Sequence, residues 1–175
     1  MLRACGARQE IAVLDRRLLI LLRTRLRADL LDHAAATYAS LGESGGLWIA
    51  LALGGAAADD ERRPRWLAAA GTVPLTLGLN YVLKRVVRRE RPQIEGLEPF
   101  GRIPRSRSFP SAHAATSFAG AVRIGALVPG ARVPLLAAAT LMALTRPYLG
   151  VHYPSDVVAG AAVGTAIALT LEAAS

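Results

Sequence analysis

The chain has 175 residues, 53% hydrophobic and 19% charged, so its length suits one domain and its composition excludes an intrinsically disordered protein. A net charge of +8 comes from 21 Lys and Arg residues against 13 Asp and Glu. This excess leaves anionic lipid headgroups, phosphorylated substrates and nucleic acid as partners to consider. The single Cys excludes a domain stapled by disulfides within the chain.

The first 40 residues differ from the rest, so we treat residues 1–40 and 41–175 as two regions. Between Glu10 and Leu31, seven Asp and Arg residues interrupt a series of Leu and Ile residues. This stretch is too polar to cross a bilayer and predicts an amphipathic interfacial helix on the membrane surface. The alternative is a solvated helix that packs on the remainder of the domain.

Five uncharged or nearly uncharged segments follow, at residues 44–58, 66–83, 114–128, 133–145 and 157–171. Only residues 66–83 reach by themselves the roughly 17–25 residues of a membrane span, although polar flanks can extend to the interface. The segments lack the polar face of soluble helices and are rich in Ala, Gly, Ser and Thr, which favour close packing of membrane helices.

We therefore expect an all-α integral membrane helical bundle with about five short transmembrane helices, a multi-pass protein of the cell membrane. The alternative is a soluble bundle of buried, Ala-rich helices. With five spans, the N-terminal region and the loops at residues 85–110 and 146–156 fall on the same side of the membrane. These two loops and the helix ends beside them carry three polar clusters.

The first cluster is a basic run from Lys84 to Pro92 at the end of the second apolar segment. If the helix continues, Lys84, Arg88 and Arg91 share one side, and Pro92 ends the helix near residue 91. Taken alone, such a run is also typical of a topology signal or a lipid-headgroup contact.

The second cluster, Phe109 to His113, begins the third apolar segment. Ser111 is suited to cap a helix, whose free N–H groups and positive dipole end form a ready anion site. His113 could donate a proton there, whereas its simplest interpretation is an interfacial polar residue.

The third cluster joins the last two segments and contains Arg146, His152 and Asp156. A carboxylate beside His152 would fix the imidazole tautomer and leave its other nitrogen free to attack. The alternative is a capped loop with Asp156 as the helix N-cap. No thiolate or carboxylate cluster accompanies these residues, which argues against a metal-dependent phosphatase.

Together, the motifs Lys84-x6-Arg91-Pro92, Pro110-Ser111-Ala112-His113 and Thr145-Arg146-x5-His152-x3-Asp156 resemble the type-2 phosphatidic acid phosphatase superfamily of membrane lipid phosphatases, over about residues 44–172. Two positions depart from the usual pattern, since Ala112 replaces Gly and Thr145 replaces Ser. A methyl group at residue 112 is a small change if the backbone there avoids positive φ.

The resemblance implies a metal-independent reaction in two steps, with no cofactor. His152 forms a phosphohistidine, Asp156 orients His152, and His113 protonates the leaving oxygen. The residues implied in phosphate binding are Lys84, Arg91, Ser111, Ala112 and Arg146.

Shorter phrases, Leu41-Gly42-Glu43 and Leu149 to Asp156, are similar to small actinobacterial members of the superfamily. This similarity implies a polyprenyl-linked substrate such as decaprenylphosphoryl-5-phosphoribose phosphate. Undecaprenyl pyrophosphate and phosphatidylglycerophosphate phosphatases share the three motifs and are alternatives.

Other classes are a vanadate-dependent haloperoxidase, which is generally larger and soluble, and a non-enzymatic basic protein that binds anionic lipid. Nucleic-acid binding is disfavoured because few aromatic residues are available to stack on bases. The expected partners are a lipid phosphate substrate and the bilayer, with a homo-oligomer left open.

Overall fold

A computed structural model describes residues 2–101 and 103–174, which form helices and loops with no strand in these two ranges. The all-α class is therefore confirmed. In chain order the helices are α1 (Leu2–Arg25), α2 (Asp29–Leu41), the short 3-10 helix η1 (Glu43–Gly45), α3 (Gly46–Ala58), α4 (Arg63–Val87), α5 (Ala112–Leu127), the 3-10 helix η2 (Pro129–Ala131), α6 (Arg132–Tyr148) and α7 (Pro154–Ala173).

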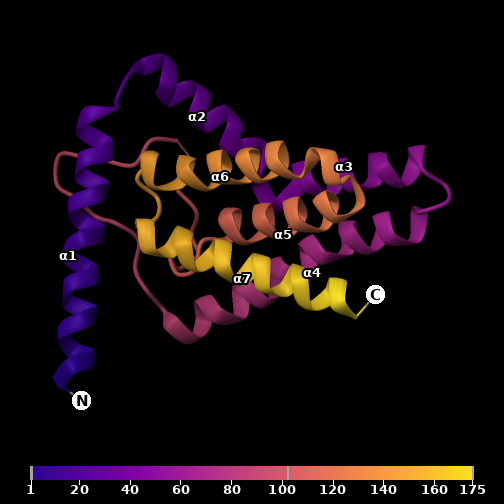
Figure 1. The fold of residues 1–175 in the computed structure, drawn as a ribbon. Helices are drawn as coiled ribbons and strands as arrows, with labels where there is room; N and C mark the ends of the chain where they lie inside the picture. Colours follow the sequence, from indigo (N-terminus) through magenta and orange to yellow (C-terminus); the bar gives the residue numbers. More distant parts are fainter. Residues whose placement is uncertain (1, 102, 175) are drawn as a thin grey trace.

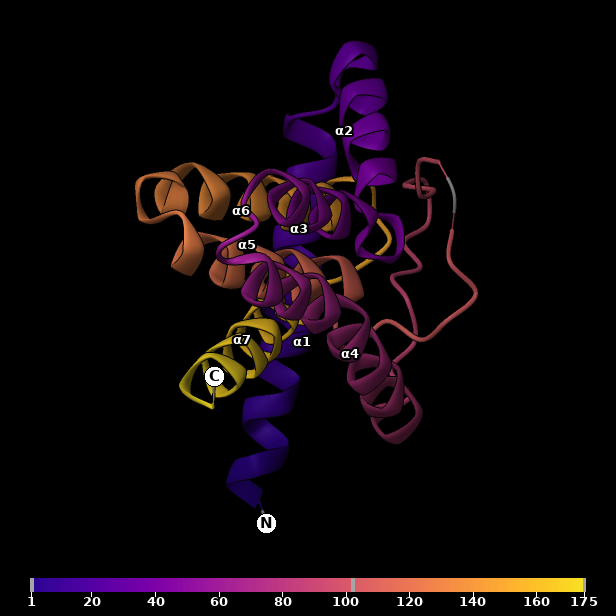
Figure 2. The same cartoon turned by 90° about the vertical axis from the view of Figure 1, so that its right-hand side faces the viewer.

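Helix α5 occupies the centre of a bundle formed by α3 to α7, which run side by side in Figure 1 and are seen nearly end-on in Figure 2. The interior of this bundle is rich in small residues, which surround a few large buried side chains such as Trp48, Trp66 and Met142. The buried small residues include Ala52, Ala69, Ala115, Ala119, Ala139 and Ala143. Large apolar side chains instead point outward, among them Leu51, Leu67, Leu75, Leu141 and Leu169. An interior rich in small residues beneath an apolar outer surface is the arrangement expected of helices that pack in lipid.

Each of the five apolar segments predicted from the sequence forms one helix, α3 to α7. Two of them, α4 and α7, are long and apolar enough to cross a membrane, with 25 and 20 residues. Helix α3 has 13 residues, which corresponds to about 20 Å against a hydrocarbon core of about 30 Å. The number of about five spans thus remains a prediction.

Helix α1 crosses the end of the bundle at a steep angle (Figure 1). The side that faces the protein includes the apolar Leu19 as well as polar residues, and Arg16 and Arg17 are exposed. Asp15 and Arg23 are buried, whereas Ile11, Leu14 and Leu21 are exposed. The single helix predicted between Glu10 and Leu31 is wrong in one respect, because the chain bends at residues 26–28 and α2 begins at Asp29.

The end of α4 also differs from the prediction, since the helix stops at Val87 and not near residue 91. Arg88 has a φ of 55°, a left-handed conformation that ends the helix, and its N–H donates to the carbonyl of Lys84. The Arg88 side chain turns back to the carbonyl of Arg85. Arg88 therefore does not share a face with Lys84 and Arg91, and the chain from Arg89 onward is free to fold over the bundle end.

Close packing of α5 against α7 generates a stability prediction. A Cβ atom at Gly164 would lie 2.0 Å from the carbonyl oxygen of Ala115, a backbone atom that cannot rotate away. Gly164→Ala should therefore destabilise the protein by about 1–3 kcal/mol, as overpacking does in other cores. We expect a lower Tm for this variant in thermal unfolding of the detergent-solubilised protein.

Gly78→Ala is the matched control, because this exposed glycine of α4 has no atom within 4 Å of the added Cβ. Its Tm should equal or exceed that of the unchanged protein, since Ala favours helix over Gly. Equal Tm values for the two variants would contradict the packing described here.

Candidate active site

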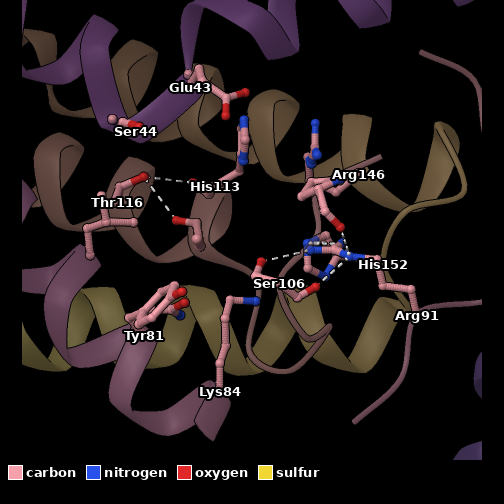
Figure 3. A pocket seen from close by; sticks show the side chains of 16 residues that line it. Glu43, Ser44, Tyr81, Lys84, Arg91, Ser106, His113, Thr116, Arg146 and His152 are labelled. Carbon is pink, nitrogen blue, oxygen red and sulfur yellow. Dashed lines mark hydrogen bonds between the residues drawn. The ribbon is translucent and has the colours of Figure 1, made fainter. Parts of the chain in front are cut away.

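The three polar clusters meet at one end of the bundle, where α4 ends, α5 and α7 begin, and α6 ends (Figure 1). A cavity of about 280 Å³ opens there. It is lined by six of the eight residues predicted for the site: Lys84, Arg91, Ala112, His113, Arg146 and His152. In Figure 3 the side chains of Lys84, His113, Arg146 and His152 approach the same space from four different segments.

His152 and Asp156 form the buried pair that the sequence predicted. The His152 Nδ1 lies 3.5 Å from the Asp156 Oδ2, and both side chains are almost fully buried. Asp156 is the third residue of α7 and not its N-cap, a position taken by Tyr153, whose N–H donates to Asp156 Oδ2 at 2.9 Å. The carboxylate is thus fixed by the helix start and directed at the imidazole.

The second nitrogen of His152 faces the guanidinium of Arg91, with 3.1 Å between Nε2 and an Arg91 terminal nitrogen. A guanidinium can only donate hydrogen bonds, so Nε2 is the unprotonated nitrogen and the proton resides on Nδ1, next to Asp156. This tautomer presents a nucleophilic lone pair on the side of the cavity. Arg91 is itself held by the carbonyls of Val151, Pro104 and Ser106.

Burial, aided by the neighbouring Arg91 and opposed by the hydrogen bond to Asp156, lowers the pKa of His152 from its usual 6.5 to about 3. His152 lies in the loop between α6 and α7. At neutral pH the imidazole is therefore uncharged and able to attack.

Lys84 and Arg146 add two further positive charges to the cavity. The ammonium of Lys84 donates hydrogen bonds to the carbonyls of Arg107 and Ser108, at 2.6 and 3.1 Å. These bonds hold the Lys84 side chain against the loop that follows α4. The Arg146 Nε is buried and has no hydrogen-bond partner within the described part of the chain. The carboxylate of Glu43 lines the same cavity and offsets only part of this charge, so the lining keeps a positive excess that favours an anion.

His113 lies on the first turn of α5, and its Nε2–H donates to the carbonyl of Ala39 in α2, at 3.1 Å. This bond leaves Nδ1 as the nitrogen available to exchange a proton. Ala112 stands in an ordinary helical conformation, because Ser44 and Arg88 account for the non-glycine positive φ values among the described residues. The methyl group that replaces the usual glycine is therefore accommodated.

Ser111 and Asp156 do not line the cavity. The Ser111 hydroxyl accepts from the N–H of Ala114 as the N-cap of α5, and its N–H donates to the carbonyl of Asp156. Its predicted contact with phosphate stays a prediction, whereas the structure shows it joining the starts of α5 and α7.

Sequence reasoning missed two side chains that hold Asp156. The Ser108 hydroxyl donates to Asp156 Oδ2 at 2.5 Å and lies 3.4 Å from His152 Nδ1. Arg89 donates to Asp156 Oδ1 at 2.8 Å and stacks over the Tyr153 ring. Both lie in the loop after α4, where no regular spacing connects them to residue 156, so no sequence signal was available.

Similarity to known proteins agrees with this geometry. A family model described as the PAP2 superfamily matches residues 65–173. The chain is 44% identical over 119 residues to decaprenylphosphoryl-5-phosphoribose phosphatase of Mycolicibacterium smegmatis, a match that covers 68% of this chain and 65% of that protein. The chain thus spans slightly less than two thirds of the length of this relative.

Two solved structures share the fold. A transmembrane PAP2-type phosphatidylglycerolphosphate phosphatase from Bacillus subtilis superposes with a TM-score of 0.78 at 22% identity, over 94% of this chain and 85% of the other. LpxE of Aquifex aeolicus superposes with a TM-score of 0.72 at 27% identity, over 90% and 93%. Since the family model matches more than half of the residues and includes all three motifs, the chain belongs to the PAP2 superfamily.

Proposed function

We propose that this protein hydrolyses a phosphate ester of a membrane lipid through a phosphohistidine on His152. The observation that carries the proposal is the His152 side chain, which is held between Asp156 and Arg91 with its Nε2 unprotonated beside a cavity of three cations. A protein that only bound anionic lipid would need the cations but not a buried His–Asp pair.

In the first step, the Nε2 lone pair of His152 attacks phosphorus, and the bond from phosphorus to the leaving oxygen breaks. The leaving oxygen takes a proton from Nδ1 of His113, which takes up that proton when the anionic substrate binds, because a neighbouring negative charge favours the imidazolium. Arg91 releases Nε2 and, with Lys84 and Arg146, holds the phosphoryl oxygens, which carry most of the charge in such transition states. The Nδ1–H of His152 donates to Asp156, which balances the positive imidazole.

In the second step, water attacks phosphorus and the bond from phosphorus to His152 Nε2 breaks. His113, now deprotonated, takes a proton from the water, so the two steps together restore the enzyme. Every group in this scheme belongs to the described cavity or to the hydrogen bonds behind it.

The substrate that we favour is a polyprenyl-linked phosphate of the decaprenylphosphoryl-5-phosphoribose type. The support is the name of the relative at 44% identity, together with the apolar outer surface of the bundle, which suits a lipid-anchored substrate. Phosphatidylglycerophosphate and undecaprenyl pyrophosphate are the competing substrates, and the same cation cavity would accept their phosphate groups.

The proposal predicts phosphate release by the detergent-purified protein in the presence of EDTA, and its loss in His152→Ala. Removal of a nucleophile should lower kcat by roughly 10⁴-fold or more. The assay compares the polyprenyl phosphoribose phosphate, undecaprenyl pyrophosphate, phosphatidylglycerophosphate and phosphatidic acid. His33→Ala, which changes an exposed histidine of α2, should retain full activity.

Release that survives in His152→Ala would contradict the phosphohistidine, and release abolished by EDTA would contradict metal independence. Absence of release from every lipid, combined with halide oxidation in the presence of vanadate and peroxide, would favour a haloperoxidase instead. Lipid binding without any turnover would favour the non-enzymatic alternative.

The low pKa of His152 also predicts how stability depends on pH. An unfolded histidine takes up a proton near pH 6.5, whereas the folded protein keeps His152 neutral down to about pH 3. Below pH 6.5 the unfolded state thus binds the extra proton, and stability falls by up to about 1.4 kcal/mol per pH unit as the pH decreases.

Thermal unfolding at pH 7 and pH 5 tests this. The decrease in Tm between these values should be smaller for His152→Gln than for the unchanged protein, because the variant lacks the titrating group. His33→Gln should show the full decrease. The same decrease in all three proteins would mean that His152 is not the group responsible.

A further inference from the structure

Asn80 is a buried polar residue of α4 to which the proposed mechanism gives no role. Its side chain is fully buried, and neither the amide nitrogen nor the amide oxygen has a hydrogen-bond partner in the described ranges. A buried amide without partners is unfavourable for folding. Asn80 nevertheless lines the same cavity as Lys84, which lies one helical turn further along α4.

The surroundings of Asn80 do not supply its partners. Thr116, which also lines the cavity, donates its hydroxyl to the carbonyl of Ala112 at 2.9 Å. Thr76, one turn before Asn80, donates to the carbonyl of Thr72 at 2.8 Å. Leu77 offers only hydrocarbon. The amide therefore faces the cavity with its donors and its acceptor uncommitted.

Asn80 also lies deeper in the bundle than the cations. The end of α4 and the start of α5 are at the same end of the bundle, so Asn80 is one turn below Lys84, and Thr116 is one turn below His113. His113, the proposed donor to the leaving oxygen, lies one turn above Thr116, so a leaving group bonded to that oxygen can extend inward toward Thr116 and Asn80.

We propose that Asn80 hydrogen-bonds the leaving group of the substrate, an inference that rests on the proposed function. The cations can only donate, whereas an amide both donates and accepts. This combination fits a leaving alcohol that carries a further hydroxyl or ester oxygen, such as a sugar or glycerol unit between the phosphate and the lipid chain. Asn80 then selects for a polar linker at this position.

Asn80→Leu tests the inference, because leucine has a similar volume and no hydrogen-bonding group. We expect kcat/KM for the best lipid substrate to fall by roughly 10²-fold, as for other lost hydrogen bonds to a reacting substrate. The Tm should not decrease, because the substitution removes a buried unpaired amide. Inhibition by orthovanadate, which resembles the phosphoryl group without a leaving alcohol, should be unchanged.

Leu79→Ala, on the exposed side of the same helix, is the control and should retain kcat/KM. An unchanged kcat/KM in Asn80→Leu would overturn the inference. Weaker inhibition of this variant by vanadate would also overturn it, because the Asn80 amide would then contact the phosphoryl oxygens and not the leaving group. Should Asn80→Leu not fold, Asn80→Ala provides the same comparison. Absence of turnover in the unchanged protein would instead refute the proposed function.

A separate observation concerns Asp15, a buried carboxylate on α1. Its two oxygens accept hydrogen bonds from the N–H and hydroxyl of Ser155, at 2.9 and 2.5 Å, and from Arg89 at 2.8 Å. The same Arg89 donates to the carboxylate of Asp156 at 2.8 Å. A continuous path of hydrogen bonds thus connects the N-terminal helix to the carboxylate that orients His152.

We infer that Asp15 is a positioning residue for the catalytic pair. Asp15 accepts a hydrogen bond from Arg89 on the side away from Asp156. It also accepts two hydrogen bonds from Ser155, the residue directly before Asp156. Without the Asp15 charge, Arg89 would retain a single carboxylate partner and Ser155 would lose a strong acceptor at its N–H. The orientation of Asp156 toward His152 would then be less well defined.

Asp15→Asn and Asp15→Glu test this role together. We expect Asp15→Asn to lower kcat by roughly 10-fold, the scale on which support of a reactive group is usually lost, with KM little changed. Asp15→Glu, which keeps the charge, should recover part of that kcat. Asp60→Asn, in the exposed turn at the opposite end of the bundle, should behave as the unchanged protein.

A merely structural role would lower the Tm of Asp15→Asn without changing kcat per folded molecule, and that result would overturn the inference. Equal kcat values for Asp15→Asn and Asp15→Glu, or a loss confined to KM, would do the same. Since these variants are compared with the unchanged protein, a failure here leaves the proposed function intact.

Discussion

The buried carboxylate of Asp156 is the interaction on which the site depends. It receives hydrogen bonds from Ser108, Arg89 and the N–H of Tyr153, and it lies against the imidazole of His152. Its backbone carbonyl accepts from Ser111 at the start of α5. A buried charge is tolerated only when it is well paired. The hydrogen bonds that pair Asp156 therefore also hold together the loop after α4 and the starts of α5 and α7.

The small residues of the bundle make that convergence possible. Gly160 and Gly164 of α7 lie so close to α5 that an added Cβ would meet backbone oxygens of Ser111 and Ala115. Close helices bring their ends together, and the cavity with its three cations is enclosed between these ends. These cations outnumber the single carboxylate of Glu43 in the cavity, so the packing of the bundle creates a site that favours an anion.

The N-terminal region contributes more than a surface anchor. Asp15 and Arg23 of α1 form hydrogen bonds at the end of the bundle that holds the cavity, and the carbonyl of Ala39 in α2 accepts from His113. The exposed side of α1 is apolar at Ile11, Leu14 and Leu21. A helix of this kind would join the membrane surface to the residues around the cavity, with Asp15 and Arg23 turned to the protein while Arg16 and Arg17 stay exposed.

The sequence alone determined the helical class, the five apolar segments and the three motifs, because hydrophobic runs and fixed spacings are local properties of the chain. It also predicted the pairing of His152 with Asp156, since residues four apart across a helix start are close in any fold. The break at Arg88, the support from Arg89, Ser108 and Asp15, and the unpaired amide of Asn80 could not be predicted. These features depend on contacts between distant segments. The tertiary structure brings the helix ends together, and it thereby decides which polar groups there have hydrogen-bond partners and which remain free to bind a substrate.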